Sequence, residues 1–227
     1  LLQMQVPPPP VPKISMPLLM TADQLRQLPA TPYVVRNVFP VQGLAAIYGE
    51  PGSGKSFLAL DLAQAIAAGT TDWFGFRVRQ TPVAYIALEG VGGIGRRATA
   101  LEIHTKKRCP DQLRFWRRDI HLLTGEDIEL LASEILQATG SGTIFIIDTL
   151  NQASPGADEN SSSDMGKIIA SSKRLAAAVH GLVILVHHAG KNRSQGLRGH
   201  SSLLAAMDTV IEVSKAARRW SITKAKD

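Results

Sequence analysis

The stretch GEPGSGKS, residues 49–56, decides the fold of this chain of 227 residues. It follows the apolar run LAAIY and fits the pattern G-x-x-x-x-G-K-[ST]. Glycines in such a loop let successive backbone N–H groups turn inward around phosphate oxygens, where a Cβ would obstruct them. The helical pattern that follows would direct its positive end at the same phosphates. The stretch therefore predicts a site for a nucleoside triphosphate, which we expect to be ATP.

Individual side chains of this loop have distinct expected roles. Lys55 is expected to reach the β- and γ-phosphates, and Ser56 is expected to ligate Mg²⁺. The nucleotide is expected to contact one continuous run of residues. These are Gly49, Glu50, Pro51, Gly52, Ser53, Gly54, Lys55, Ser56 and Phe57.

Two acidic residues follow later apolar runs. Asp148 closes TIFIID, residues 143–148, and is predicted to be the second Mg²⁺ ligand, on a strand beside the phosphate loop. Glu89 follows PVAYIAL, residues 82–88, at the edge where parallel strands present ligands. Its carboxylate is predicted to be the general base that activates water. An aspartate that only forms a turn and a glutamate that only faces solvent are the alternatives.

Apolar strand patterns alternate with helical stretches along the chain. Several are continuously apolar, as in parallel strands that are covered on both faces. Between them, SFLALDLAQAIAAG at residues 56–69 places Leu58, Leu62 and Ile66 on one helical stripe and Gly69 at its end. We therefore predict an α/β fold with a central, mostly parallel sheet and an antiparallel hairpin at 208–225. The predicted strands are 44–49, 82–88, 119–124, 143–148, 182–187, 208–214 and 219–225.

The composition limits the class of protein. Cys109 is the single cysteine, so no internal disulfide can form, which favours a reducing, cytoplasmic location. No apolar run approaches the ~20 residues that cross a bilayer, so no membrane partner is expected. The formal net charge of +6 fits a polyanionic partner but is also common on ordinary basic proteins. Basic pairs such as Arg96-Arg97 and Arg117-Arg118 are expected on solvated helix faces.

Residues 1–20 differ in composition from the remainder of the chain. They contain a proline run, which cannot donate backbone hydrogen bonds and favours an extended polyproline conformation. We interpret them as an arm or linker, and residues 21–227 as one ATPase domain. An arm that packs on a neighbouring subunit is the alternative. Thr21 and Gln24 have the spacing of a capping box and predict the start of a short helix.

The motifs GEPGSGKS, YIALEG, IIDTL, VILVHHAGK, LRGHSSL and ITKAKD, in this order, resemble those of the RecA-like ATPases of the hexameric replicative helicases. The resemblance is greatest to the plasmid RepA type and covers residues 30–227. It implies a RecA-like three-layer P-loop fold and a catalytic role for Glu89. It also implies a histidine that senses the γ-phosphate at the end of the strand after Asp148. His188 matches this histidine, and His187 is the alternative.

The resemblance further implies cations that act across a subunit interface. Arg198 is the first candidate for a finger that acts in trans, and Lys224 and Lys226 are further candidates. Lysine stands where related helicases often carry arginine, and it is a poorer bidentate ligand for phosphate. Lys191 and Arg193 lie in a stretch rich in Gly and Ser and are candidates for a DNA-binding loop. A solvated loop is the alternative reading of that stretch.

These features predict an ATP-hydrolysing motor that forms a homo-oligomeric ring, expected to be a hexamer. It would act on single-stranded DNA as the replicative helicase of a plasmid, phage or other mobile element. A RecA-like recombinase or mediator ATPase would share the same core but form filaments. A regulatory or loading module that binds ATP and DNA without unwinding is a third possibility.

Overall fold

The computed structural model describes residues 19–29, 32–89, 91–189 and 201–226. The chain divides into two compact units, residues 1–31 and residues 32–227. The described part of the first unit contains helix α1 (Ala22–Arg26). The Thr21 hydroxyl accepts from the Gln24 amide at 3.2 Å, and the Gln24 side chain accepts from the Thr21 amide at 2.8 Å. The predicted capping box is confirmed.

The second unit is built on a seven-stranded sheet. The described strands of the whole unit, including two outside this sheet, are β1 (Tyr33–Val35), β2 (Phe39–Pro40), β3 (Gly43–Gly49), β4 (Val83–Ala87), β5 (Leu113–Trp116), β6 (Ile144–Asp148), β7 (Leu182–His188), β8 (Thr209–Ser214) and β9 (Arg219–Ala225). β1 and β2 form a separate antiparallel pair, and the others follow the order β5-β4-β6-β7-β3-β8-β9. Neighbouring strands of the large sheet are parallel except β8 and β9. The mostly parallel sheet and its closing antiparallel hairpin are confirmed.

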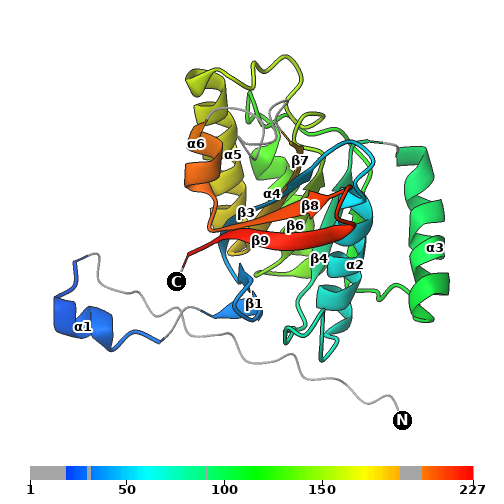
Figure 1. Cartoon of the computed structure of the whole chain (residues 1–227). Helices are drawn as coiled ribbons and strands as arrows, with labels where there is room; N and C mark the ends of the chain where they lie inside the picture. Colours follow the sequence, from blue (N-terminus) through cyan, green and yellow to red (C-terminus); the bar gives the residue numbers. More distant parts are fainter. Residues whose placement is uncertain (1–18, 30–31, 90, 190–200, 227) are drawn as a thin grey trace, which may run out of the picture. The chain divides into compact units, whose positions relative to one another are not determined.

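Helices cover both faces of this sheet (Figure 1). They are α2 (Lys55–Ala68), the 3₁₀ turn η1 (Val91–Gly93), α3 (Ile94–Thr105), α4 (Ile128–Thr139), α5 (Ser162–Val179) and α6 (Ser201–Ala206). One hydrophobic layer contains residues of α2, α3, β1 and β2, and the other contains residues of α4, α5 and α6. α2 ends where the sequence predicts, because Gly69 takes the left-handed conformation of a C-cap with φ 65°. The result is a three-layer α/β unit.

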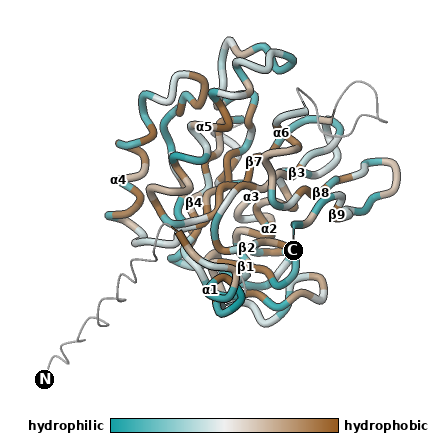
Figure 2. The backbone as a smooth tube through the Cα atoms, turned by 90° about the vertical axis from the view of Figure 1, so that its left-hand side faces the viewer, coloured by the Kyte–Doolittle hydropathy of each residue, from teal (hydrophilic) through white to brown (hydrophobic). Residues whose placement is uncertain are grey.

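The continuous apolar runs are explained by these two layers. Side chains alternate between the faces of a strand, so Ile144 and Ile146 of β6 belong to the layer of α2, and Phe145 and Ile147 belong to the opposite layer. Figure 2 shows hydrophobic colour along the central strands, with more hydrophilic colour on the peripheral loops. In the part of the chain that the structure describes, no helix combines the length and the apolar character needed to span a bilayer.

The predicted strand at 119–124 is wrong. The strand of this region is β5, which begins earlier and pairs Leu113 with Val83 of β4. Ile120 and Leu122 are 1% and 0% exposed, but they enter the core from an irregular segment. The Leu122 amide donates to the Ala153 carbonyl at 2.7 Å, outside any ladder. The segment is apolar because its side chains are buried in the core, and it does not pair as a strand.

Candidate functional site

The predicted phosphate loop connects β3 to α2. Gly49 ends β3 so close to β8 that a Cβ there would collide with the Val213 carbonyl. Gly54 is the N-cap of α2 with φ 94°, a conformation that favours glycine, and no side chain caps the helix. The first N–H groups of a helix have no intrahelical partner, so those of α2 face the loop as anion-binding donors. The strand, loop and helix therefore occur in the order that the sequence predicts.

A cavity of about 430 Å³ opens at this loop. It receives side chains from the loop itself, the segment after β4, α3, the segment after β6 and the end of β7. Its lining residues are Pro51, Gly52, Ser53, Gly54, Lys55, Ser56, Phe57, Glu89, Arg97, Thr149 and His188. The structure thus brings the predicted phosphate loop, the predicted base and one predicted sensor histidine to a single cavity.

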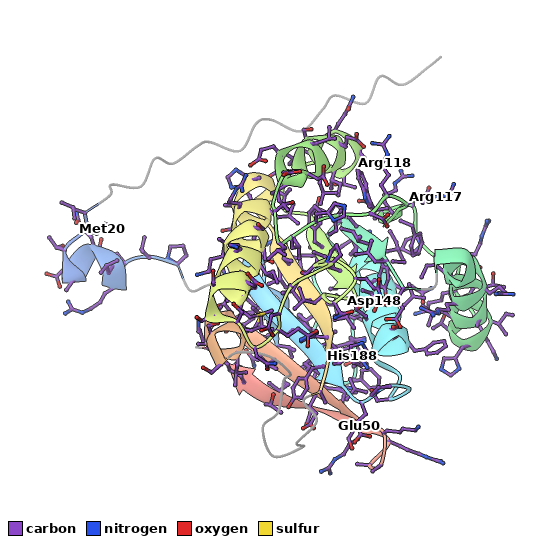
Figure 3. All side chains as sticks on the ribbon, turned by 90° about the horizontal axis from the view of Figure 1, so that it is seen from above. Met20, Glu50, Arg117, Arg118, Asp148 and His188 are labelled. Atoms are coloured by element: carbon purple, nitrogen blue, oxygen red, sulfur yellow. The ribbon has the colours of Figure 1, made fainter. Side chains whose placement is uncertain are left out.

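The ends of adjacent parallel strands explain this convergence. Asp148 ends β6 and His188 ends β7, and Gly49 pairs directly with His188 across β3 and β7. His188 faces the same side of the sheet as Val186, which belongs to the layer of α2. His187 faces the opposite side and is 0% exposed, so of the pair only His188 lines the cavity. Figure 3 shows Asp148 and His188 near each other and Arg117 apart from them.

Lys55 is buried beside two carboxylates. Its side chain is in the first turn of α2, and its Nζ donates to the Glu50 carbonyl across the loop at 2.8 Å. Burial lowers the pKa of Lys55, and the negative charges of Asp148 and Glu89 act in the opposite direction. The ammonium group and both predicted acidic residues therefore lie within electrostatic range of one another.

Asp148 presents one bonded and one unbonded oxygen. The residue is 1% exposed, and its Oδ2 accepts a hydrogen bond from the Tyr85 hydroxyl at 2.7 Å. Its Oδ1 is buried and has no hydrogen-bond partner among the described residues. Burial raises the pKa of Asp148, whereas the Tyr85 and Ser56 hydroxyls lower it. The Ser56 hydroxyl and the Asp148 carboxylate thus lie close together.

These two groups fit a magnesium ion that is bound together with a phosphate. Mg²⁺ prefers hard oxygen ligands and usually takes one or two from the protein and the remainder from phosphate and water. The Ser56 hydroxyl and the unbonded Asp148 oxygen are ligands of this kind. Within the described ranges, no group of three or more His, Cys, Asp and Glu residues is placed so that it could hold a metal ion.

Arg97 is a cavity residue that the sequence analysis missed. It was expected on a solvated helix face, but it lines the cavity from α3, and its charge lowers the pKa of Asp148. The neighbouring Arg96 is exposed and does not line the cavity. Which of these two adjacent arginines faces the cavity depends on how α3 is rotated about its own axis, and the sequence does not establish that rotation. Arg117 and Arg118 follow β5 in an irregular segment, so the prediction of a helix face is wrong for them.

Lys215 is a second cation that the sequence analysis missed. The turn between β8 and β9 brings its Nζ to 3.7 Å from the position that a Cβ on Gly52 would occupy. β8 runs parallel to β3, so the hairpin turn necessarily lies at the same sheet edge as the phosphate loop. No motif in the sequence marked this residue.

The C-terminal lysines lie at the other edge of the sheet. Lys224 pairs with Val210 near the beginning of β8, away from the phosphate loop. Its Nζ donates to the carbonyls of Leu204 and Ala205 at 2.7 and 3.1 Å. The Nζ of Lys226 contacts Asp208 Oδ1 at 3.0 Å. Both ammonium groups are therefore held within their own chain and do not reach its phosphate loop. The remaining candidates, Lys191, Arg193 and Arg198, lie outside the described residues.

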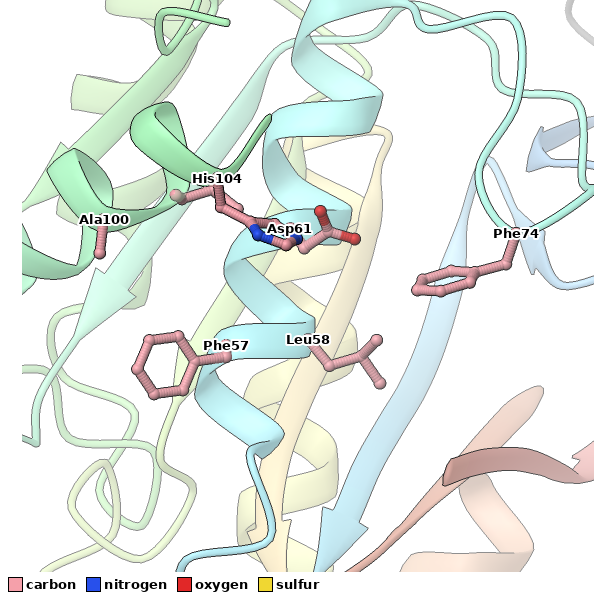
Figure 4. Close-up of a pocket in the computed structure, with 7 residues that line it drawn as sticks. Phe57, Leu58, Asp61, Phe74, Ala100 and His104 are labelled. Atoms are coloured by element: carbon pink, nitrogen blue, oxygen red, sulfur yellow. The ribbon is translucent and has the colours of Figure 1, made fainter. Parts of the chain in front are cut away.

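A second, apolar cavity of about 410 Å³ adjoins α2, the helix that follows the phosphate loop (Figure 4). It is lined by Phe57, Leu58, Asp61, Phe74, Ala100, Leu101 and His104. Phe57 lines both cavities and is 59% exposed. An aromatic ring therefore stands at the border between the polar phosphate cavity and an apolar cavity.

Comparisons with known proteins agree with this architecture. A protein family described as an AAA domain matches residues 8–194. No curated protein sequence matches the chain. A KaiC-like protein from the archaeon Pyrococcus horikoshii superposes with a TM-score of 0.55 at 14% identity, over 86% of this chain and 84% of that one. The RadB recombinase superposes with a TM-score of 0.53 at 16% identity, over 81% of each chain. At such identities the likeness concerns the fold alone.

Proposed function

This chain belongs to the AAA domain family and is a RecA-like P-loop ATPase, and we propose that it is a ring-forming motor that hydrolyses ATP on single-stranded DNA. The observation that carries this proposal is one cavity that joins a phosphate loop to a carboxylate, an arginine and a histidine. These side chains belong to Lys55, Glu89, Arg97 and His188. Transfer of a phosphoryl group to water requires that the triphosphate is held in place, that cations stabilise its negative charge and that a general base activates the water. The cavity contains a candidate for each of these roles.

The loop and two cations bind the triphosphate in this proposal. The amides at the start of α2 surround the phosphates, and Lys55 contacts them with an ammonium group that is already buried at the site. Arg97 approaches from α3, and its guanidinium adds a charged, bidentate donor. Ser56 and Asp148 would hold the magnesium ion, which neutralises phosphate charge during the reaction.

Glu89 is the proposed general base. Its side chain lines the cavity and is exposed, so water has access to its carboxylate. Its backbone is fixed, because the amides of Leu88 and Glu89 both donate to the Asp148 carbonyl, at 2.7 and 3.2 Å. The base and the proposed metal ligand are therefore tied to each other through the backbone. This connection supports a precise placement of the carboxylate relative to the terminal phosphate.

His188 is the proposed sensor of the γ-phosphate. It lines the cavity at the end of β7, and the chain continues directly toward Lys191 and Arg193. A hydrogen bond from its ring to the γ-phosphate would be lost on hydrolysis, and this loss would act on the segment that we propose to contact DNA. The polar cavity and the basic sequence that follows are the two observations that support this link.

A ring is proposed because the resemblance to hexameric helicases implies a cation that acts across a subunit interface. Lys224 and Lys226 lie at the sheet edge opposite the phosphate loop. A finger in trans would reach the ATP of the neighbouring subunit, and an added cation strongly accelerates phosphoryl transfer. Arg198 remains the first candidate for this finger, since the two lysines already have partners within their own chain.

The test is the ATPase rate with and without single-stranded DNA, together with the oligomeric mass in the same buffer. We expect DNA-stimulated turnover by an oligomer, and loss of both nucleotide binding and turnover in Lys55→Ala. A protein that stays monomeric with ATP and Mg²⁺, and whose turnover ignores DNA, would contradict the motor. Strand displacement on a forked substrate then tests the proposed role as a replicative helicase.

A recombinase or mediator ATPase is the second candidate, because it would share the fold that this chain has in common with the RadB recombinase. Such a protein would coat DNA as a filament in place of forming closed rings. Electron microscopy of the protein on single-stranded DNA with a non-hydrolysable ATP analogue separates the two. A loading or regulatory module would bind ATP and DNA but leave a forked substrate intact.

A further inference from the structure

Tyr85 is the first residue of the YIALEG motif, but the sequence alone assigns no role to its hydroxyl. The residue lies on β4 and is 0% exposed. Its hydroxyl is 2.7 Å from Asp148 Oδ2 on the neighbouring strand β6. We propose that Tyr85 is a positioning residue, which holds one oxygen of Asp148 so that the other is presented to a magnesium ion. This inference rests on the proposed binding of a magnesium nucleotide.

The sheet register explains why a tyrosine can fill this position. Tyr85 pairs with Ile146, so Asp148 is its diagonal neighbour on the same face of the sheet. Diagonal neighbours lie ~7–8 Å apart at their backbones, a separation that a long aromatic side chain spans and a short hydroxyl side chain does not. The Phe115 ring packs beside Tyr85 with a centroid distance of 6.0 Å and restricts its movement.

The Tyr85 hydroxyl can donate one hydrogen bond, and the distances indicate which group accepts it. Besides Asp148, the Ser56 carbonyl lies within reach at 3.4 Å, which is a poor distance for such a bond. The 2.7 Å contact to the carboxylate is the better one, so the Tyr85 hydroxyl donates its hydrogen bond to Asp148 Oδ2.

The second carboxylate oxygen of Asp148, Oδ1, is the one available to a metal ion. Asp148 Oδ1 is buried and has no hydrogen-bond partner among the described residues, which is costly unless a ligand occupies the site. A carboxylate with both oxygens bonded within the protein would have little left to offer a metal ion. A carboxylate with neither bonded could rotate about its last torsion. Tyr85 fixes one oxygen and leaves the second available, in the way that outer-shell partners orient metal ligands.

The experiment compares Tyr85→Phe with Tyr48→Phe. Tyr48 is a buried tyrosine on β3 whose hydroxyl lies near Glu212 and Thr223 and not near Asp148. Binding of a fluorescent non-hydrolysable ATP analogue is titrated with MgCl₂, and separately measured in EDTA. We expect Tyr85→Phe to weaken the apparent Mg²⁺ affinity by about tenfold to a hundredfold. Its nucleotide affinity in EDTA and all values for Tyr48→Phe should match those of the unmodified protein.

Three results would decide against the inference. Unchanged Mg²⁺ affinity in Tyr85→Phe would overturn it, and so would an equal loss of nucleotide binding in EDTA, since that indicates a purely structural effect. In the Asp148→Asn background, Tyr85→Phe should have no further effect on Mg²⁺ affinity, and a full additional loss would show that it does not act through Asp148. If the unmodified protein showed no Mg²⁺-dependent nucleotide binding, the proposed function would itself fail, a result distinguishable from failure of Tyr85 alone.

Discussion

Gly49 and His188 pair directly across β3 and β7, and the Ala189 amide donates to the Gly49 carbonyl at 3.0 Å. The first residue of the phosphate loop and the histidine that lines its cavity therefore share one rung of the sheet. A change at the γ-phosphate would reach the end of β7 without any intermediate element.

His188→Ala is expected to retain ATP binding but to lose stimulation by DNA. Loss of a hydrogen bond to a charged group costs about 1.5–3 kcal/mol, which corresponds to roughly a tenfold to hundredfold fall in DNA-stimulated turnover. Steady-state ATPase rates with and without single-stranded DNA measure this effect. His187→Ala should lower the thermal unfolding temperature more strongly, because it removes a side chain that is 0% exposed. Normal DNA stimulation in His188→Ala would contradict a sensor role.

Glu89→Gln is expected to bind ATP normally while turnover falls by about two to four orders of magnitude, as for the loss of a general base. Amide and carboxylate have nearly the same size, so the cavity should keep its shape. Single-turnover hydrolysis and nucleotide binding are measured in parallel. Glu102→Gln is the matched control on α3, where the carboxylate accepts from the Cys109 amide outside the cavity. Equal turnover in the two variants would place the base elsewhere.

The sequence predicts the parts of this site that are local along the chain. The phosphate loop and α2 follow from glycine spacing and an apolar stripe, and Asp148 and Glu89 follow from their places after apolar strands. These features need no knowledge of neighbouring strands. The structure adds that their side chains meet at one sheet edge, while their chemical roles stay predictions.

Features that depend on distant contacts could not be predicted in this way. The strand expected at 119–124 is a buried irregular segment, because Ile120 and Leu122 pack in the core while the ladder to β4 is made by Leu113 and its neighbours. The contact from Tyr85 to Asp148 joins residues far apart in sequence and depends on which strands become neighbours.

Arg97→Ala is expected to weaken catalytic efficiency with ATP by about tenfold to a hundredfold, because a charge-assisted donor to phosphate is removed. Arg96→Ala removes the same charge from the adjacent position, which is exposed and does not line the cavity. The pair therefore separates a direct contact from a general change in net charge. Steady-state kinetics at two salt concentrations measure both effects. A similar loss in the two variants would indicate long-range electrostatics in place of a phosphate contact.

Phe57→Ala is expected to weaken ATP binding while leaving binding of inorganic tripolyphosphate unchanged. The Phe57 ring is 59% exposed and borders both cavities, so a base extending from the phosphate loop toward the apolar cavity would meet its face. Stacking of a base on an aromatic side chain contributes about 1–3 kcal/mol, so the affinity for ATP should fall by roughly fivefold to more than a hundredfold.

Phe74→Ala is the control for this last prediction. Phe74 lines only the apolar cavity, and its ring contacts Trp73 and Trp220 at centroid distances of 5.2 and 5.4 Å. Its removal should leave ATP affinity unchanged if the base ends at Phe57. Isothermal titration with ATP and with tripolyphosphate distinguishes the possibilities. An equal loss for both ligands in Phe57→Ala would mean that the ring supports the shape of the phosphate loop. A loss for ATP in both variants would mean that the base reaches deeper, toward the turn that carries Phe74.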